Sequence, residues 1–368
     1  MSGLSKTDTD IVIFITDLGS GGAQRVACAL AKHWISHNRT VSIVTLSEPE
    51  HDFFSVPDNV IRKTLGLNTP SSSFAISLIR NFQRIWRLRR VFLELKPAVA
   101  IGFIGPAAVL VVAAAIGTNI RTIAAERNDP SRQSFGKIWD VLCYFAYRYA
   151  DRITVNSTGA HAALSKKFTP DQIMLAPNPI PPVTSGPTPQ LAGPTILFVG
   201  RLHPQKGVDY LVRAFAALTA PDWHLLIVGE GTQLANLEAM SEELGIDAQI
   251  TFTGAVQDPT PYYRSADIFV LPSRYEGTPN ALMEAMCHGL PVVISDASSG
   301  PLDLVEESDA GIVTSTGDVH ALMHALQRLI NDSALRKRLG ANAWEGMEKK
   351  RKQDKSYKLW DAALDFSR

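Results

Sequence analysis

The sequence predicts an α/β protein made of two doubly wound domains, each built on a parallel sheet. Short apolar runs rich in β-branched residues recur along the whole chain, and each is followed by a glycine-containing turn and a segment of helical periodicity. Residues 176–194, rich in proline, glycine, serine and threonine, indicate a linker between the halves. The tail from residue 331 is helical and charged, and no strand follows it.

We expect five strands in each half. In the first half they lie at residues 11–16, 40–46, 99–104, 121–125 and 152–156, and in the second at residues 195–200, 224–229, 249–253, 268–271 and 291–295. The expected boundaries are a first domain at 1–178, a linker at 179–194, a second domain at 195–345 and a helical tail at 346–368. Ligands of open parallel sheets bind beyond the carboxyl ends of the strands, so the residues after each strand are the first candidates for a site.

One uncharged stretch, residues 98–117, is about long enough to cross a bilayer. Gly105-Pro106 interrupts it, and the part before this break has the length of a buried parallel strand. The part after it reads as an alanine-rich helix with proline in its first turn. We therefore expect a strand and a helix here. In the tail, the expected apolar anchors are Trp344, Tyr357, Trp360 and Phe366.

Composition excludes several classes of protein. The chain of 368 residues has 36 Lys and Arg against 36 Asp and Glu, so it lacks the basic excess typical of proteins that bind nucleic acid. Cys28, Cys143 and Cys287 lie far apart, which fits neither a disulfide framework nor a metal site and favours a reducing, cytoplasmic setting. The polar start, residues 1–10, has no secretory signal pattern. The only D-x-D, at residues 8–10, precedes the first strand, so we expect no metal site there.

The loop after the first expected strand is rich in glycine. Gly21 and Gly22 open a helix there, where backbone amides attract anions and a ligand can approach the chain closely. The spacing does not match the G-x-G-x-x-G pattern of dinucleotide-binding proteins. A tight turn without a ligand remains the alternative.

Two cations follow the first strand of the second half. Arg201 and Lys206 share one short loop, and such a pair can converge on a pyrophosphate, with Arg offering a fork and Lys a point charge. A solvated loop is the alternative interpretation.

Two acids surround the start of a helix in residues 273–289. We expect Thr278 to cap this helix, Pro279 to take its first position and Gly289 to end it. Glu276 lies on the preceding loop, and Glu284 lies four residues after Asn280 on the same helical face. A carboxylate suits the paired hydroxyls of a ribose, and amides at a helix start suit phosphate oxygens. The alternative for Glu284 is an ordinary exposed helix acid.

A basic amphipathic helix is expected at residues 74–95. Arg80, Arg84 and Arg87 align on one side, while apolar residues take the opposite side. Such a helix can bind an anionic partner or lie against an anionic leaflet. The alternative is a core-packed helix with a solvated arginine face. Arg89 projects into the apolar sector, without an explanation from the pattern.

Together, these motifs resemble the retaining, GT-B-fold glycosyltransferases of family 4 over nearly the whole chain. The matching features are the E-x7-E pair Glu276 and Glu284, the upstream Arg201 and Lys206, and Gly21-Gly22 near the start. The resemblance implies two Rossmann-like domains facing a cleft, with the helix at 346–368 crossing back to the first domain. It also implies sugar transfer from a nucleotide-sugar substrate, with UDP as the expected nucleotide and with neither a cofactor nor a metal.

The resemblance assigns roles within the second domain. It implies that Arg201 and Lys206 hold the donor pyrophosphate, that Glu284 binds the ribose and that Glu276 lies beside the transferred sugar. It further implies that the amides of Asn280 and Ala281 lie near the phosphates and that Val256 lies next to the base.

Within the family, the chain is similar to PglH-like transferases, which extend polyprenyl-diphosphate-linked oligosaccharides. The similarity rests on residues 21–25, the basic helix and Ala125-Glu126-Arg127-Asn128. It implies acceptor contacts by Glu126 and Arg127 and by Arg80, Arg84 and Arg87. It also implies attachment to the cytoplasmic face of the inner membrane. Many relatives carry His where this chain has Arg127. Transfer to a soluble acceptor, a non-catalytic sugar or nucleotide sensor and a dinucleotide-dependent oxidoreductase are the competing interpretations.

Overall fold

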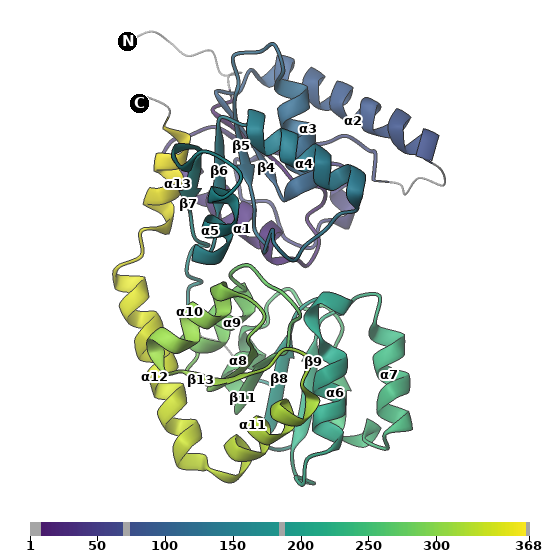
Figure 1. Ribbon diagram of the computed structural model, residues 1–368, viewed down its shortest axis with the longest axis vertical. Helices are drawn as coiled ribbons and strands as arrows, with labels where there is room; N and C mark the ends of the chain where they lie inside the picture. The colour runs from purple at the N-terminus through teal and green to yellow at the C-terminus, as the bar shows by residue number, and fades with distance from the viewer. Residues whose placement is uncertain (1–8, 69–73, 184–187, 366–368) are drawn as a thin grey trace. The chain divides into compact units, whose positions relative to one another are not determined.

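The computed structural model describes residues 9–68, 74–183 and 188–365, and it forms two compact units. Unit 1 spans Met1–Pro179 together with Lys355–Arg368, and unit 2 spans Ile180–Asp354. Each unit is a parallel sheet covered by helices, as the ribbon in Figure 1 shows. The predicted pair of doubly wound domains is thereby confirmed.

The sheet of unit 1 has seven parallel strands in the order β3-β2-β1-β4-β5-β6-β7. The strands are β1 (Ile11–Phe14), β2 (Val41–Thr45), β3 (Ile61–Thr64), β4 (Val99–Phe103), β5 (Arg121–Ala125), β6 (Arg152–Val155) and β7 (Ile173–Leu175). The helices are α1 (Gly22–Ser36), α2 (Phe74–Leu95), α3 (Gly105–Ala115), α4 (Lys137–Tyr149), α5 (Thr158–Ser165) and α13 (Ser356–Leu364), with short 3-10 turns at Pro49–His51 and Pro170–Gln172.

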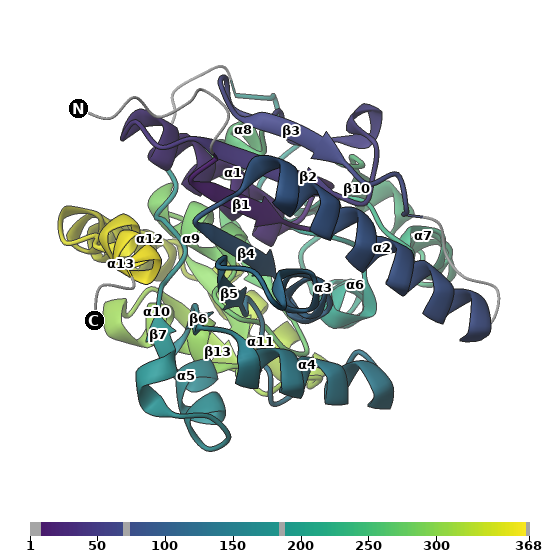
Figure 2. The same ribbon diagram turned by 90° about the horizontal axis from the view of Figure 1, so that it is seen from above.

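Alternation along the strands divides the core of unit 1 into two faces. Ile11, Ile13 and Ile15 pack against α1 and α13, whereas Val12 and Phe14 pack against α2 and α3. Side chains of successive strand residues point to opposite faces, so one buried strand supplies both cores. Figure 2 shows α2, α3 and α4 beside one another, with α3 between the other two.

The sheet of unit 2 has six parallel strands in the order β10-β9-β8-β11-β12-β13. The strands are β8 (Thr195–Val199), β9 (His224–Val228), β10 (Ile250–Phe252), β11 (Ile268–Leu271), β12 (Val292–Ser295) and β13 (Gly311–Thr314). The helices are α6 (Val208–Ala216), α7 (Leu234–Glu243), α8 (Thr260–Ser265), α9 (Asn280–Cys287), α10 (Ser299–Ser308), α11 (Val319–Asn331) and α12 (Ser333–Lys352), with 3-10 turns at Pro204–Lys206 and Asp247–Gln249.

All ten expected strands are present, and three edge strands were not predicted. β3 and β7 form the two edges of the first sheet, and β13 forms one edge of the second. β3 reads Ile-Arg-Lys-Thr and is half-exposed, β7 has only three residues, and β13 begins with Gly311. Edge strands carry weak apolar patterns because only one neighbour and part of one face cover them, and this is why the sequence signal was lost.

The tail returns to unit 1 later than the expected boundary at residue 346. α12 continues through Lys352 as part of unit 2, and only α13 belongs to unit 1. Trp360 is fully buried in the core of unit 1, where it stacks on Phe103 with ring centroids 5.9 Å apart. Tyr357 packs at the edge of the same cluster, while Trp344 is half-exposed and was wrongly expected to be an anchor. Phe366 lies outside the described residues.

The uncharged stretch at 98–117 divides as predicted into β4 and α3. Among the residues that the structure describes, no helix combines the length and the apolar character needed to span a bilayer.

Candidate active site

The candidate site of unit 2 lies where the strand order of its sheet reverses. β8 is flanked by β9 on one side and by β11 on the other, so the loops that follow β8 and β11 leave the sheet in opposite directions. A crevice at the carboxyl ends of the strands is expected at such a point. The loop after β8 carries Arg201 and Lys206, and the loop after β11 carries Glu276.

The two loops approach so closely that a glycine is required at position 207. Gly207 has a φ of +62°, and a Cβ atom there would lie 2.1 Å from the carbonyl oxygen of Pro272. Only glycine adopts this conformation without strain and leaves this space free. The Lys206-Gly207 pair therefore ends the 3-10 turn at Pro204–Lys206 and brings its lysine beside the β11 loop.

Glu276 is the centre of a small charged cluster. The Lys206 amine lies 2.5 Å from Oε1 of Glu276, and the Ser273 hydroxyl donates to the same oxygen at 2.6 Å. The backbone N–H of Glu276 donates to the Ser298 hydroxyl at 3.0 Å. Glu276 is only 6% exposed. A buried carboxylate with this many partners is fixed in position and charge-compensated.

A second set of contacts holds the two loops together. Gln205 donates its side-chain amide to the Tyr275 carbonyl at 3.0 Å, and the Arg274 N–H donates to the Gln205 carbonyl at 2.7 Å. The Arg274 guanidinium pairs with both oxygens of Asp209 and stacks over Tyr210 at 4.2 Å. Bidentate pairing and stacking restrict a loop far more than one hydrogen bond does. The cluster around Glu276 therefore has a rigid support.

The helix after the β11 loop begins later than the sequence indicated. α9 starts at Asn280 with Pro279 at the cap position, so the helix begins one residue after the expected first position at Pro279. The expected end is confirmed, because Gly289 follows α9 with a φ of +71° and its N–H donates to the Met286 carbonyl.

Glu284 is buried inside α9. It is 5% exposed, which contradicts the alternative of an ordinary solvent-exposed acid. Ala281 and Val256, expected near the phosphates and the base, both pack against the apolar cluster that contains Leu282 and Met283. The structure thus brings the β10 loop and α9 to one cluster. By contrast, the Arg201 side chain is exposed on the loop after β8.

The sequence reasoning missed three residues that shape this site, namely Ser273, Ser298 and Gln205. Each lies on a loop at the carboxyl edge of the sheet, and each makes a hydrogen bond within the two-loop assembly. Their position after a strand was the available signal, but serine and glutamine are common in loops for unrelated reasons.

The glycine-rich loop of unit 1 is organised by Asp17. Its Oδ1 accepts the Gly19 N–H at 2.9 Å and the Gln24 side-chain amide at 3.0 Å. Gly21 precedes α1 and Gly22 is its first residue, as expected from the sequence. A Cβ atom on Gly21 would lie 2.2 Å from the Gln24 side chain, so this glycine leaves space for the Asp17–Gln24 contact.

Glu126 and Arg127, although adjacent, point to different surroundings. Oε2 of Glu126 accepts the Tyr147 hydroxyl at 2.6 Å, and Oε1 accepts the N–H groups of Arg127 and Asn128 at 2.8 and 3.0 Å. Burial raises the pKa of Glu126, and the hydrogen bond from Tyr147 opposes this shift.

The Arg127 side chain turns toward the tail. It donates to the Ala176 carbonyl and to the Thr154 hydroxyl, both at 2.7 Å, and it stacks over Trp360 at 4.7 Å. Burial lowers the pKa of Arg127 to about 9. The expected acceptor contact by Arg127 is therefore corrected. This residue binds α13 to the sheet, since its guanidinium is occupied by the core of unit 1.

α2 has the predicted bounds, and its carboxyl-terminal half packs into unit 1. Leu88, Phe92 and Leu95 pack into unit 1, whereas Phe82 is 71% exposed and Trp86 is 50% exposed. The helix is therefore core-packed, as the alternative has it, but its arginine side is only partly solvated: Arg80 and Arg84 are half-buried and Arg87 is exposed.

The arginines of α2 bind backbone carbonyls of unit 1. Arg84 donates to Leu67 at 2.8 Å, and Arg87 donates to Leu65 at 2.5 Å. Arg80 is half-buried and lies near enough to Arg84 to contribute to the lowered pKa of Arg84, for which burial is the larger cause. Arg89, unexplained by the sequence, donates to Ala114 and Ile116 at the end of α3. An arginine at a helix carboxyl end satisfies free carbonyls.

Two family models match the chain in succession. Residues 20–183 match the model described as Glycosyltransferase Family 4, and residues 188–345 match the model described as Glycosyl transferases group 1. The first match covers most of unit 1 and ends four residues into unit 2, inside the expected linker, and the second lies within unit 2.

Full-length relatives agree with these matches. An uncharacterized glycosyltransferase of Haemophilus influenzae is 29% identical over 88% of this chain and 91% of its own. A Campylobacter jejuni α-1,4-N-acetyl-D-galactosaminyltransferase, named for a diphospho-undecaprenol-linked glycan, is 26% identical over 90% of this chain and 92% of its own. The solved structure of Anabaena HepE in complex with UDP and glucose has a TM-score of 0.78 at 17% identity, and it covers 97% of this chain and 99% of its own.

Proposed function

Because the chain belongs to the glycosyltransferases of family 4 and has their GT-B fold, we propose that it transfers a sugar from a UDP-sugar to a lipid-linked glycan, with retention of anomeric configuration. The observation that carries this proposal is the buried cluster of Lys206, Glu276 and Ser273 at the strand reversal of unit 2. HepE, a protein of similar fold, was solved with UDP and glucose.

The donor end of the reaction follows from the groups around α9. Glu284 binds the ribose hydroxyls through its carboxylate, and the backbone N–H groups of Asn280 and Ala281 at the start of α9 donate hydrogen bonds to the phosphates. Val256 packs on the base. Glu276 lies beside the transferred sugar, where its fixed carboxylate accepts a sugar hydroxyl. We propose that Gly21 and Gly22 let a substrate approach the backbone closely at the start of α1.

The cations stabilise the leaving group. As the glycosidic bond to the diphosphate breaks, negative charge grows on the phosphate oxygens, and preorganised cations lower the energy of that state. Lys206 and Arg201 supply two such charges, so we propose that transfer is independent of a divalent metal. The acceptor hydroxyl attacks from the face that the nucleotide leaves, which gives retention.

The lipid-linked nature of the acceptor is supported by relatives and by the surface of unit 1. The Campylobacter relative is named for an undecaprenol-linked glycan. α2 and α4, the helices on either side of α3, expose large apolar side chains that include Phe82, Trp86, Phe145 and Tyr149. Apolar and aromatic faces of this kind lie at bilayer surfaces. We propose peripheral attachment to the inner membrane face through these two helices.

Nucleotide release tests the proposal. The full chain is incubated with a panel of UDP- and GDP-sugars, with either an undecaprenyl-diphosphate-linked glycan or the same glycan without lipid. We expect nucleotide release to depend on one UDP-sugar and on the lipid-linked acceptor, and ¹H NMR of the product to show the donor's anomeric configuration. Equal turnover of the lipid-free glycan would exclude the lipid-linked acceptor, and an inverted product would exclude retention.

A further inference from the structure

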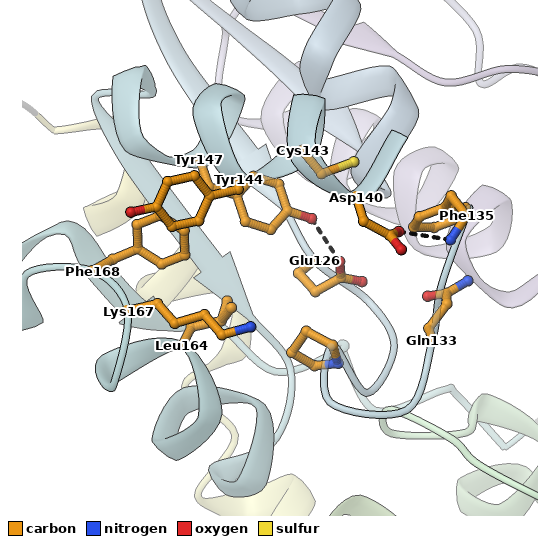
Figure 3. Close-up of a pocket in the computed structure, with 11 residues that line it drawn as sticks. Glu126, Gln133, Phe135, Asp140, Cys143, Tyr144, Tyr147, Leu164, Lys167 and Phe168 are labelled. Atoms are coloured by element: carbon orange, nitrogen blue, oxygen red, sulfur yellow. Dashed lines mark hydrogen bonds between the residues drawn. The ribbon is translucent and has the colours of Figure 1, made fainter. Parts of the chain in front are cut away.

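Unit 1 contains a cavity that the donor chemistry does not use. It has a volume of about 210 Å³ and lies between α4, α5 and the loop that follows β5 (Figure 3). Cavities for drug-sized ligands usually span about 300–1,000 Å³. The space in unit 1 therefore suits a smaller group, of the size of a single sugar ring.

Aromatic side chains form much of its wall. The rings of Tyr144 and Phe168 lie 5.4 Å apart, those of Tyr147 and Phe168 lie 6.0 Å apart, and Phe135 lines another part of the cavity. Flat apolar rings bind the C–H face of a sugar and bury little polar surface of their own. The wall therefore favours a ligand that has an apolar face and a polar rim.

The polar groups of the cavity have unused hydrogen-bonding capacity. Oε2 of Glu126 accepts one hydrogen bond, from Tyr147, and a carboxylate oxygen can accept two. Oε1 of Gln133 is buried and has no partner among the described residues. Lys167 directs its amine into the same space (Figure 3). The cavity thus offers two acceptors and one cationic donor, a set that hydroxyl groups satisfy because they both donate and accept.

Charge argues against a phosphate ligand here. Two carboxyl groups, Glu126 and Asp140, line the cavity together with one lysine. Asp140 already accepts hydrogen bonds from the Ser134 hydroxyl and the Phe135 N–H. A diphosphate would meet like charge, whereas an uncharged sugar would not.

We propose that this cavity binds one pyranose ring of the glycan acceptor. That the sugar belongs to the acceptor rests on the proposed function. That the ligand is a sugar rests on the lining of the cavity. Glu126 directly follows β5, so the subsite lies at the edge of the sheet where sites of this fold occur. α4 contributes Asp140, Tyr144 and Tyr147 to the cavity, while its outer side carries exposed apolar residues. A glycan attached to a membrane lipid would reach the cavity along this helix.

Binding of simple glycosides tests the proposal. The full chain, saturated with UDP, is titrated with methyl N-acetyl-α-D-galactosaminide and with methyl α-D-glucopyranoside, and binding is followed by saturation-transfer NMR. We expect at least one glycoside to bind. Gln133→Leu should weaken its binding about tenfold, the loss of one buried hydrogen bond, and Lys167→Met should weaken it less because Lys167 is exposed. Lys166→Met is the matched control, since Lys166 is exposed and does not line the cavity.

Three outcomes would overturn the subsite: neither glycoside binds, the cavity variants bind as tightly as the parent, or inorganic phosphate displaces the glycoside. Thermal unfolding of each variant verifies that it is folded. UDP affinity is measured in parallel and should stay unchanged in both cavity variants. If the parent chain binds no UDP or transfers no sugar, the proposed function is refuted, but the glycoside result still stands.

Discussion

The two units share a sheet topology and differ in what they expose. Among the described residues, all but four of the exposed large hydrophobic side chains lie in unit 1, and the four in unit 2 are Val183, Leu244, Val313 and Trp344. Except for Ile61 and Ile116, those of unit 1 lie on α2 and α4. Because protein surfaces in contact with water rarely carry large apolar patches without a partner, this difference supports the proposed attachment of unit 1 to a membrane.

The two sheets also differ in the side chains that lie at their carboxyl edges. Unit 2 gathers charged side chains there, with Lys206 and Arg201 on one loop and Glu276 on the next. Unit 1 has a buried carboxyl at Glu126, held by backbone N–H groups and a tyrosine, beside an aromatic cavity. We therefore expect anion chemistry in unit 2 and recognition of an uncharged ligand in unit 1, because the loops rather than the sheet supply the chemistry.

The largest effect is expected at the donor site of unit 2. Glu284→Ala removes a buried carboxylate that should hold the ribose, at a cost of about 2–3 kcal/mol, and should lower kcat/KM about 30- to 150-fold. Glu242→Ala, an exposed acid on α7, is the control and should leave kcat/KM unchanged. Turnover of Glu284→Ala close to that of the parent would refute the role assigned to this residue.

The next effect concerns the cations of unit 2. Lys206→Ala should weaken UDP binding about tenfold, since it also leaves the buried Glu276 carboxylate without its cation, and Arg201→Ala should have a smaller effect because its side chain is exposed. Isothermal titration measures both, with the exposed Arg213→Ala as control. Activity should persist in a chelator. Restoration of a chelated enzyme by Mg²⁺ or Mn²⁺ would contradict metal-independent transfer.

Two tryptophans sharpen the contrast between the apolar surfaces. Trp86 on α2 and Trp344 on α12 are each 50% exposed. Trp86→Ser should weaken binding to anionic liposomes about fivefold, the loss of about 1 kcal/mol of apolar burial, whereas Trp344→Ser should not. Liposome flotation with and without salt measures this. Equal flotation of both variants would contradict a contact between α2 and the membrane.

The smallest effect is a pH dependence in unit 1. Burial raises the pKa of Glu126, so the carboxyl ionises in the unfolded chain before it ionises in the folded one. The folded state then binds more protons, and stability falls as the pH rises through this window. Glu126→Gln lacks this loss. Its free energy of unfolding should therefore rise relative to that of the parent as the pH is raised from about 4 to about 8. Urea titrations at both pH values measure the gain, and the exposed Glu50→Gln should show none.

The sequence by itself determined the fold class and the elements that carry the candidate site. Continuous apolar runs predicted the buried strands, because a parallel strand covered on both faces has no polar side to conceal its pattern. Residue type and spacing singled out Glu276, Glu284, Arg201 and Lys206, since charged residues after buried strands stand out locally. Helix α2 was predicted with its observed bounds because its composition is helical throughout.

Only the tertiary structure decided which partner each side chain has. Two arginines of α2 turned out to bind carbonyls of unit 1, while Phe82 and Trp86 remained outside. Periodicity divides a helix into two sides but does not say which one packs on the sheet when both contain long side chains. The Arg127 side chain turns away from Glu126 and stacks on Trp360, which lies more than two hundred residues later in the chain. The cavity beside Glu126 likewise joins a loop and two helices, and no local pattern encodes a space between segments that meet only after folding.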